Sequence, residues 1–370
     1  MKDKLVLVTG AAGFCASRLI EELLSRGYKV RATDLEGVSL ERISGYLDRI
    51  EFRAADITKP ETIKPLLKDV EVVFHPAAIF SYSVPLELLR KVNVEGTRNI
   101  IELSIKEGVS KMVVWSSVAA YGAADPKFYK LPIRECSVEE MNPAIKGKYD
   151  LSKREQEAVV VKYWEENKFP ISILRPAPMY GPGSYYGIYT LFKYIEEELL
   201  SVVPSNLANN RASMPLVNVK DVAKAAIFLS EKNKGDGESY NIVDDNTLDL
   251  VETIRYIALL TNSKVEVIFP LPMKLTYYLL KLFSKWSLWE AKKLRKKVNG
   301  KPPIPYLESD LLVYLLGNFW FSNQKIKGLG FEFDYPDRSI GLIETIDWYN
   351  KNGWEKTMAI KGSEQIKEGK

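Results

Sequence analysis

The chain has 370 residues, 46% of them hydrophobic and 27% charged, proportions typical of a globular protein large enough for one α/β domain and an additional lobe. The net charge of +4 is small beside 52 basic and 48 acidic residues, so no general affinity for nucleic acid is expected. One histidine and two cysteines, without metal-ligand spacing, argue against a metal site and indicate a reducing, cytoplasmic compartment.

The first predicted unit is a strand, a glycine turn and a helix. Residues 4–9 are apolar without alternation, as in a parallel strand buried on both faces, and this run is too short for a signal peptide. The turn GAAGF then opens a helix expected to end near Arg26. Gly10 and Gly13 let the backbone approach a pyrophosphate, which the free amides of a helix N-terminus stabilise. We therefore place Gly10, Ala12, Gly13 and Phe14 against a dinucleotide, although such turns also occur without a ligand.

A second strand, expected over residues 29–33, ends in Asp34, which lies 24 residues after Gly10. An acidic side chain at this place accepts hydrogen bonds from the adenosine ribose hydroxyls and repels a 2′-phosphate. The sequence therefore favours NAD over NADP. Arg31 and Arg53 are close enough in sequence to keep NADP open.

The third strand is expected over residues 51–55. Asp56 and Ile57 follow it, and we place them at the adenine edge of the cofactor. The alternative for Asp56 is a cap for the helix or turn that begins at Lys59.

The fourth strand is expected over residues 70–74. Ala77 and Ala78 follow it, and their small side chains leave room for a ligand beside the sheet. His75 is the single histidine, and we expect a partly buried histidine with satisfied hydrogen bonds rather than a catalytic base.

A candidate acid/base pair follows an amphipathic helix predicted over residues 86–108 and a fifth strand over residues 111–116. Tyr149 and Lys153 are four residues apart, so on a helix they share a face and the ammonium can favour the ionised phenol. This cation and a bound nicotinamide ring would both lower the phenol pKa toward neutrality, where proton transfer is most efficient. The alternative is an ordinary solvated helix face.

The segments TGAAGF, DLE, ADIT, HPAA, NVEGT, WSSVAAYG, YDLSK and LRPAPMYGPG occur in this order with ordinary spacings. Together they resemble the extended short-chain dehydrogenase/reductase superfamily, also called the NAD-dependent epimerase/dehydratase superfamily, and most closely its 3β-hydroxysteroid dehydrogenase-like branch. The resemblance is strongest over residues 4–183 and continues faintly to about residue 350. It implies a Rossmann-type, doubly wound parallel α/β sheet with a smaller C-terminal substrate lobe.

The resemblance also implies roles for single residues. Tyr149 would donate or accept the proton at the reacting hydroxyl or carbonyl, and Lys153 would lower its pKa and hold the nicotinamide ribose. Ser117 matches the catalytic serine or threonine that polarises the carbonyl, with Ser116 as its neighbour, and Asn93 would support the active-site helix and its water. The candidate cofactor contacts are Gly10, Ala12, Gly13, Phe14, Asp34, Asp56, Ile57, Ala77, Ala78, Asn93, Ser116, Tyr149, Lys153, Pro176 and Met179.

The expected domain division places an NAD-binding domain at residues 1–175, to which residues 212–243 return. Residues 176–211 and 244–355 form the substrate lobe, and 356–370 form a flexible tail. Pro176 and Met179 belong to a stiff turn after a sixth strand over residues 171–174, which in relatives lies against the nicotinamide. Later elements are a helix over 189–200, a loop over 206–211, a strand and helix over 216–223 with Asp221 at the cap, a strand over 239–243 and a helix over 339–350.

Two departures bear on the substrate. Enzymes of nucleotide sugars usually carry a Gly-Asp-Gly run and an arginine that grips the diphosphate, whereas this chain has only Arg211, as a candidate phosphate clamp or a solvated loop residue. Residues 273–297 mix leucines and aromatic residues with lysines and are too charged to span a bilayer. They could lie on a membrane surface, cover a lipophilic substrate, or pack as a helix pair on the lobe.

The sequence thus predicts an NAD-dependent oxidoreductase that acts on the secondary alcohol or ketone of a bulky, apolar, sterol-like substrate. The alternatives are a nucleotide-sugar epimerase or dehydratase that uses NAD transiently, and a non-catalytic NAD-binding protein, against which Ser117, Tyr149 and Lys153 argue. Because relatives commonly dimerise through the helices that here span about 86–107 and 149–166, we expect a homodimer. The expected location is cytoplasmic, with peripheral membrane contact through residues 273–297 left open.

Overall fold

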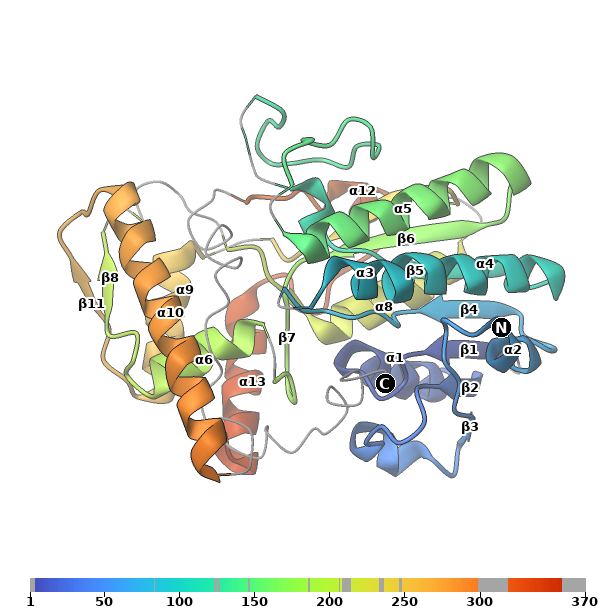
Figure 1. Ribbon diagram of the computed structural model, residues 1–370, viewed down its shortest axis with the longest axis horizontal. Helices are drawn as coiled ribbons and strands as arrows, with labels where there is room; N and C mark the ends of the chain where they lie inside the picture. Colours follow the sequence, from blue (N-terminus) through green and yellow to red (C-terminus); the bar gives the residue numbers. More distant parts are fainter. Residues whose placement is uncertain are drawn as a thin grey trace.

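The computed structural model describes residues 4–298 and 319–354, except residues 83, 123–124, 126, 146, 186, 206, 208–213, 233–235 and 246–247. At its centre lies a seven-stranded parallel sheet with the strand order β10-β6-β5-β4-β1-β2-β3 (Figure 1). The strands are β1 Leu5–Thr9, β2 Lys29–Thr33, β3 Ile50–Phe52, β4 Val72–His75, β5 Lys111–Trp115, β6 Ile171–Pro176 and β10 Ser239–Ile242. The strand order reverses between β1 and β4, and sheets of this kind bind ligands beside the carboxyl ends of the strands at that point. The predicted Rossmann-type α/β fold is confirmed.

The apolar run of β1 contributes to two separate cores. Side chains alternate in direction along a strand, and Val6 and Val8 pack into one hydrophobic cluster while Leu7 packs into the other. All three side chains are completely buried. Because helices cover both faces of the sheet, the strand has no solvent side, and this explains its lack of alternation.

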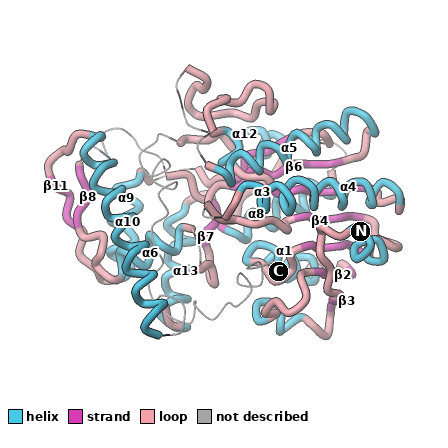
Figure 2. Tube along the Cα trace, in the orientation of Figure 1, coloured by secondary structure: helices cyan, strands magenta, loops and turns pink. Residues whose placement is uncertain are grey.

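The helices lie on both faces of the sheet. On one face α1 packs against α8, and on the other α3, α4 and α5 lie side by side (Figure 2). Their bounds are α1 Phe14–Ser25, α3 Leu86–Leu89, α4 Gly96–Lys106, α5 Lys148–Asn167 and α8 Val219–Glu231, with a short α2 at Pro60–Ile63. Short 3₁₀ turns span Glu41–Tyr46, Lys64–Leu66 and Val118–Tyr121.

The helix predicted as continuous over residues 86–108 is interrupted. Between α3 and α4 the chain forms a π-helical segment, Arg90–Glu95. Such segments are frequent at functional sites. Asn93 lies within it, and its side chain is held by Ile79 and Ser152 rather than by its own helix. Hydrophobic periodicity cannot reveal this irregularity, because the apolar positions barely change when one turn widens.

The C-terminal lobe packs around its own hydrophobic cluster, to which α6, α9 and α13 all contribute. A small parallel sheet of β8 and β11 lies at its outer edge, and α10 runs along its side (Figure 1). A second small sheet pairs β7 with β9. The elements are β7 Met179–Tyr180, α6 Ile188–Glu196, β8 Val202–Pro204, β9 Val217–Asn218, α9 Leu250–Thr261, β11 Glu266–Ile268, α10 Met273–Val298, α12 Gln324–Gly328 and α13 Arg338–Asn352.

The cap predicted at Asp221 is wrong. The N-cap of α8 is Asn218, whose side chain accepts a hydrogen bond from the amide of Lys220 at 3.0 Å. Asp221 instead accepts the backbone amides of Asp334 and Tyr335, at 2.7 and 3.0 Å, and so ties α8 to the segment before α13. The helix predicted over 189–200 also ends earlier, at Glu196.

Several expectations concern parts of the chain that are not described. Arg211, the loop around it and the tail 356–370 lie outside the described residues. The division into an NAD-binding domain and a substrate lobe stays a prediction, although β10 does lie beside β6 at the edge of the large sheet. In the described ranges, no helix combines the length and apolar character needed to cross a membrane.

Candidate active site

The glycine turn lies at the point where the strand order reverses. Gly10 has φ +62°, a left-handed conformation that glycine adopts readily. A Cβ atom at Gly10 would lie 2.9 Å from the Cα of Ala77, so the ends of β1 and β4 meet at van der Waals distance only because Gly10 lacks a side chain. Gly13 is the N-cap of α1 and no side chain caps it, which leaves the helix N-terminus suited to an anionic ligand.

Phe14, the first residue of α1, faces the turn that leaves β6. A Cβ atom at Gly181 would lie 3.6 Å from the ring of Phe14, and Arg18 donates a hydrogen bond to the carbonyl of Pro182 at 3.0 Å. Met179 is half-buried in β7 of the same turn, and Pro176 is the last residue of β6. The structure therefore places the glycine turn next to the segment predicted to lie against the nicotinamide.

Asp34 closes the glycine turn from the side of β2. Its carboxylate accepts hydrogen bonds from the amides of Ala12 at 2.9 Å and Leu35 at 2.8 Å, while burial raises its pKa. Each carboxylate oxygen can accept more than one hydrogen bond, so these contacts leave room for ribose hydroxyls.

The two arginines that kept NADP open are engaged elsewhere. Arg31 is buried, pairs with Glu51 at 2.9 Å and donates to the carbonyls of Leu66 and Lys68. Arg53 forms an ion pair with the same Glu51. Neither guanidinium is therefore poised for a 2′-phosphate, in agreement with NAD as the cofactor.

Asp56 organises the turn after β3. Its Oδ1 accepts hydrogen bonds from the amide and the hydroxyl of Thr58, at 2.9 and 2.8 Å, and its carbonyl accepts the amide of Lys59. This matches the turn-capping alternative, and the adenine contact of Asp56 stays a prediction. Ile57 is buried against α4, where a Cβ atom at Gly96 would lie 2.7 Å from its Cδ1 atom.

His75 is a structural residue. It is fully buried, its Nδ1 lies 2.8 Å from the hydroxyl of Thr9, and its Nε2 lies 2.9 Å from that of Thr97. Burial, assisted by the charge of Lys153, lowers its pKa to about 3. The imidazole therefore stays neutral and joins β1, β4 and α4, as a satisfied histidine was expected to do.

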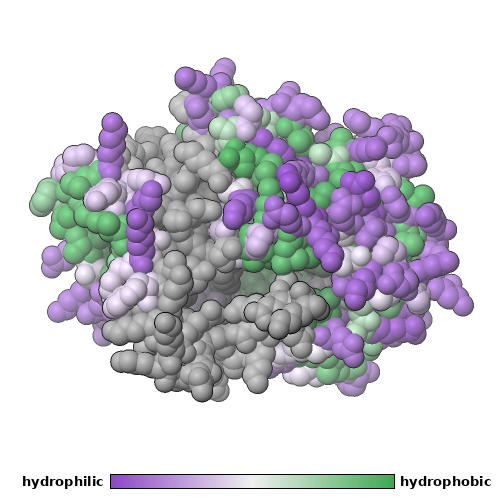
Figure 3. All heavy atoms as spheres, in the orientation of Figure 1, coloured by the Kyte–Doolittle hydropathy of each residue, from purple (hydrophilic) through white to green (hydrophobic). Residues whose placement is uncertain are grey.

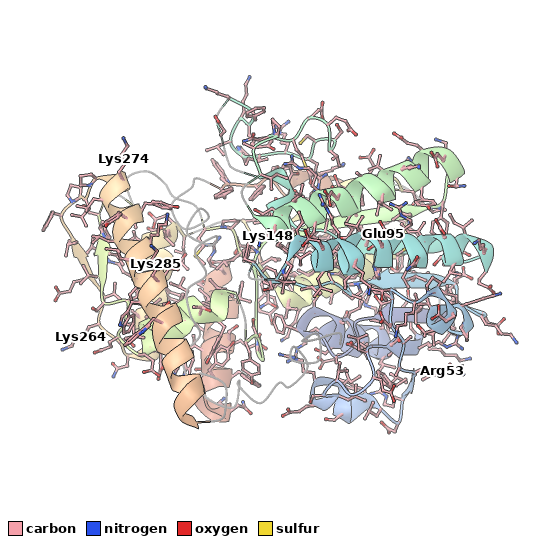
Figure 4. The ribbon with its side chains drawn as sticks, in the orientation of Figure 1. Arg53, Glu95, Lys148, Lys264, Lys274 and Lys285 are labelled. Atoms are coloured by element: carbon pink, nitrogen blue, oxygen red, sulfur yellow. The ribbon has the colours of Figure 1, made fainter. Side chains whose placement is uncertain are left out.

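Tyr149 lies in the first turn of α5, close to Lys148, which is labelled in Figure 4. Its side chain is buried, and Ser117 lies close enough to influence its pKa. Burial raises the pKa of Tyr149 and outweighs the lowering effect of Ser117. The protein by itself therefore shifts this pKa upward, and the lowering by Lys153 together with a bound nicotinamide stays a prediction.

The position of Lys153 bears on this prediction. Its ammonium lies 5.9 Å from the centroid of the Tyr149 ring, but it donates to the carbonyl of Trp115 at 2.8 Å and to Gln156 at 2.9 Å. Burial lowers the pKa of Lys153 to about 7, against the opposing effect of Glu157. The amine is thus one helical turn from Tyr149, as predicted, but is hydrogen-bonded to β5 and to its own helix.

The two adjacent serines at the end of β5 face different surroundings. Ser117 caps the 3₁₀ turn that follows and accepts the amide of Ala119 at 3.1 Å, close to Tyr149. Ser116 is buried and donates its hydroxyl to the carboxylate of Glu157. Ser116 is therefore turned into the core, and its cofactor contact stays a prediction.

A buried network that was not predicted from the sequence holds Ser116. Arg175 is 1% exposed and donates to Glu157 through Nε at 2.9 Å and Nη2 at 2.6 Å. It also donates to the hydroxyl of Tyr121 at 2.8 Å and to the carbonyl of Cys136. This network fixes α5 to the ends of β5 and β6. The available signal was an arginine at the end of an otherwise apolar strand.

Asn93 connects the loop after β4 to the start of α5. Its side chain donates to the carbonyl of Ile79 at 3.1 Å and to Ser152 at 3.0 Å, and accepts the amide of Ile79 at 2.8 Å. Ser152 in turn donates to the carbonyl of Tyr149 at 2.8 Å. These bonds suit the supporting role predicted for Asn93, while its contact with the cofactor stays a prediction.

Two aromatic residues of the loop after Ala78 also reach Tyr149, and the sequence analysis did not single them out. The ring centroids of Phe80 and Tyr82 lie 4.8 and 5.6 Å from that of Tyr149. A Cβ atom at Gly187, just before α6, would lie 3.5 Å from Phe80. Phe80 therefore lies between Tyr149 and the lobe. Two aromatic residues directly after the HPAA segment were the available signal.

The residues present fit a dinucleotide. The glycine turn would accept the pyrophosphate, Asp34 the ribose, and the region above Ser117 and Tyr149 the nicotinamide end. No metal site accompanies them, since the described residues contain no group of three or more histidine, cysteine, aspartate or glutamate side chains placed to bind an ion.

Comparison with known proteins agrees with this geometry. The family model described as the NAD dependent epimerase/dehydratase family matches residues 6–243. A UDP-glucose 4-epimerase of Vibrio cholerae is 26% identical over 290 residues, covering 76% of this chain and 83% of the relative. A sterol-4-alpha-carboxylate 3-dehydrogenase, decarboxylating, of Bos taurus is 26% identical over 255 residues, covering 67% of each chain.

The structures agree as well. The crystal structure of dTDP-glucose 4,6-dehydratase from Bacillus anthracis in complex with NAD superposes with a TM-score of 0.68 at 22% identity, covering 96% of this chain and 99% of that one. Sequence and fold thus lead to one conclusion. The chain belongs to the NAD dependent epimerase/dehydratase family and is an NAD-dependent enzyme of the extended short-chain dehydrogenase/reductase type.

Proposed function

We propose that this enzyme moves hydride between NAD and the carbon of a secondary alcohol or the corresponding ketone, with Tyr149, Lys153 and Ser117 as its catalytic residues. The main support is that Ser117 lies close enough to Tyr149 to lower its pKa, with the Lys153 amine one turn along the same helix. Ser117 orients the substrate oxygen, and Tyr149 takes or gives its proton. When bound, NAD supplies the hydride acceptor and a positive charge that favours the ionised phenol.

The surroundings of Tyr149 support an apolar, sterol-like substrate. The rings of Phe80 and Tyr82 pack against the Tyr149 ring, so the side chain has aromatic neighbours. Phe80 is 45% exposed, which leaves ring surface for contact with a hydrophobic ligand. One relative, the sterol-4-alpha-carboxylate 3-dehydrogenase, is named for such a substrate.

A nucleotide-sugar epimerase or dehydratase is the second candidate. It is favoured by the relatives, which include a UDP-glucose 4-epimerase and a dTDP-D-glucose 4,6-dehydratase. In that reaction NAD is reduced and reoxidised within one turnover, so no NADH accumulates. The absorbance of accumulated NADH therefore distinguishes the two candidates.

The test incubates the purified protein with NAD and either sterol and steroid alcohols or UDP-glucose and dTDP-glucose. We expect NADH to accumulate with the apolar alcohols, and the Tyr149→Phe variant to lose this activity by a factor of about 100 or more. Tyr163→Phe is the matched control, because Tyr163 lies on the same helix and bonds to Glu102, outside the site. Sugar-nucleotide conversion without NADH would favour the second candidate, and full turnover by Tyr149→Phe would refute the proposed mechanism.

We also propose a homodimer formed through α4 and α5. These helices lie on the same face of the sheet (Figure 2), and Arg90, in the π-helical segment before α4, donates hydrogen bonds of 2.8 and 2.6 Å to Glu155 of α5. Light scattering would report a monomer if this proposal is wrong. A cytoplasmic location is likewise a proposal, which fractionation of cells that make the protein would test.

A further inference from the structure

The helix α10 packs on the lobe through a face of mixed polarity. Among its described side chains, Thr276, Ser284 and Ser287 are buried, with at most 7% of their surface exposed, and Leu280 is partly buried beside Tyr194. The ring of Phe283 adds a contact of 5.6 Å between centroids with Tyr194 of α6. The described inner face thus combines small hydroxyl residues with the partly buried Leu280 and Phe283.

Five other apolar residues of α10 face outward. Leu275, Tyr278, Leu279, Leu282 and Trp286 follow the spacing i, i+3, i+4, i+7 and i+11, which forms one continuous stripe on a helix. Each of them is between 42% and 58% exposed. Figure 3 shows hydrophobic and hydrophilic side chains interleaved at the outer edge of the lobe, where α10 begins. The helix therefore carries an apolar stripe that the described lobe does not bury.

Lysines flank this stripe. Lys274, Lys281 and Lys285 are exposed and repeat at i, i+7 and i+11, so they form a second line beside the apolar one. Figure 4 shows Lys274 at the start of α10, directed away from the protein, and Lys285 further along the helix. The sequence between Lys274 and Trp289 contains no acidic residue. A partner surface complementary to the stripe and its lysines would be apolar and negatively charged.

We propose that α10 docks this enzyme on an anionic lipid bilayer, with the helix parallel to the surface. The stripe enters the boundary between headgroups and acyl chains, and the lysines contact the lipid phosphates. The described helix is not apolar enough to cross the bilayer. A second copy of the chain fits less well, because a two-fold contact through this face would bring the same three lysines together.

The test is co-sedimentation of the full chain with vesicles of phosphatidylcholine alone and with added phosphatidylglycerol. We expect binding to the anionic vesicles that weakens as salt is raised. Each lysine at an anionic surface strengthens binding by a factor of roughly five, so the triple variant K274Q/K281Q/K285Q is expected to bind about a hundredfold more weakly. The variant L282E/W286E is expected to lose binding to both kinds of vesicle.

Two control variants make the same kinds of substitution at exposed positions outside α10. I340E/I343E alters exposed isoleucines of α13, and K59Q/K91Q/K162Q removes three exposed lysines elsewhere; both are expected to bind like the native chain. If L282E/W286E does not fold, the lysine variant and the salt dependence decide. The proposal is overturned if the native chain ignores anionic vesicles at low salt, if the α10 variants bind unchanged, or if they alter only self-association. Because no substrate is present, the result is independent of the proposed reaction.

Discussion

The buried amine of Lys153 predicts a specific pH dependence of stability, testable by comparison with Lys153→Met. The pKa of Lys153 is lowered by burial from 10.5 to about 7. Between these two values the unfolded chain binds more protons than the folded one, so the folded state becomes more stable as the pH rises. The cost of burying the charged amine is complete below the folded-state pKa and disappears above the unfolded-state pKa.

The magnitude follows from this shift. Between about pH 7 and about pH 10, the native chain gains roughly 1.4 kcal/mol of unfolding free energy per pH unit from this group. Methionine has a similar length and no charge, so the variant lacks this gain. The variant also loses the hydrogen bonds to Trp115 and Gln156, and each loss lowers its unfolding free energy by about 1 kcal/mol at every pH.

The assay is urea unfolding of both proteins, followed by tryptophan fluorescence, at several pH values from about 7 to about 9. The difference in unfolding free energy between the two proteins is the quantity of interest, because groups common to both cancel. We expect the native chain to gain relative to the variant as the pH rises, by up to about 1.4 kcal/mol per unit. A difference that stays constant, or that falls with pH, would refute the placement of a desolvated amine at this position.

Asp34→Ala is expected to weaken NAD binding about tenfold or more and to improve the relative affinity for NADP, because the ribose hydroxyls lose a charged acceptor; an unchanged ratio in calorimetry would contradict the assignment. Glu157→Gln leaves a buried arginine without its counter-ion and is expected to cost about 3 kcal/mol or more in urea unfolding, whereas Glu155→Gln, at a half-exposed pair, costs under about 1 kcal/mol. Phe80→Ala is expected to raise KM several-fold for a sterol alcohol and little for a small secondary alcohol. Leu259→Ala, at an exposed position on α9, is its control, and equal effects on both substrates would argue against an aromatic contact.

Local pattern was sufficient for much of the sheet and the glycine turn. The unbroken apolar run of β1 indicated a strand buried on both faces, because a parallel sheet covered by helices requires it. Gly10 was recognisable because a left-handed turn beside another strand leaves no space for a side chain. The spacing of Tyr149 and Lys153 likewise follows from helical geometry alone.

Other features depend on residues far apart in the chain. Asn93 reaches Ser152 across 59 positions, and this contact accompanies a π-helical segment that no periodicity reveals. The upward pKa shift of Tyr149 was not foreseen from the sequence, because burial, which only the folded packing determines, outweighs the lowering effect of Ser117.

The sequence by itself determined the fold class, the family, the glycine turn and the spacing of Tyr149 and Lys153, because each depends on short patterns with their own geometry. Only the tertiary structure decided that Lys153 bonds to Trp115, that Phe80 covers Tyr149, and that the apolar stripe of α10 faces outward. The last case shows the reason most clearly. A helical pattern specifies that one face is apolar. In α10 the lobe packs on a different face of the helix, and only the folded structure shows that the apolar stripe is left exposed.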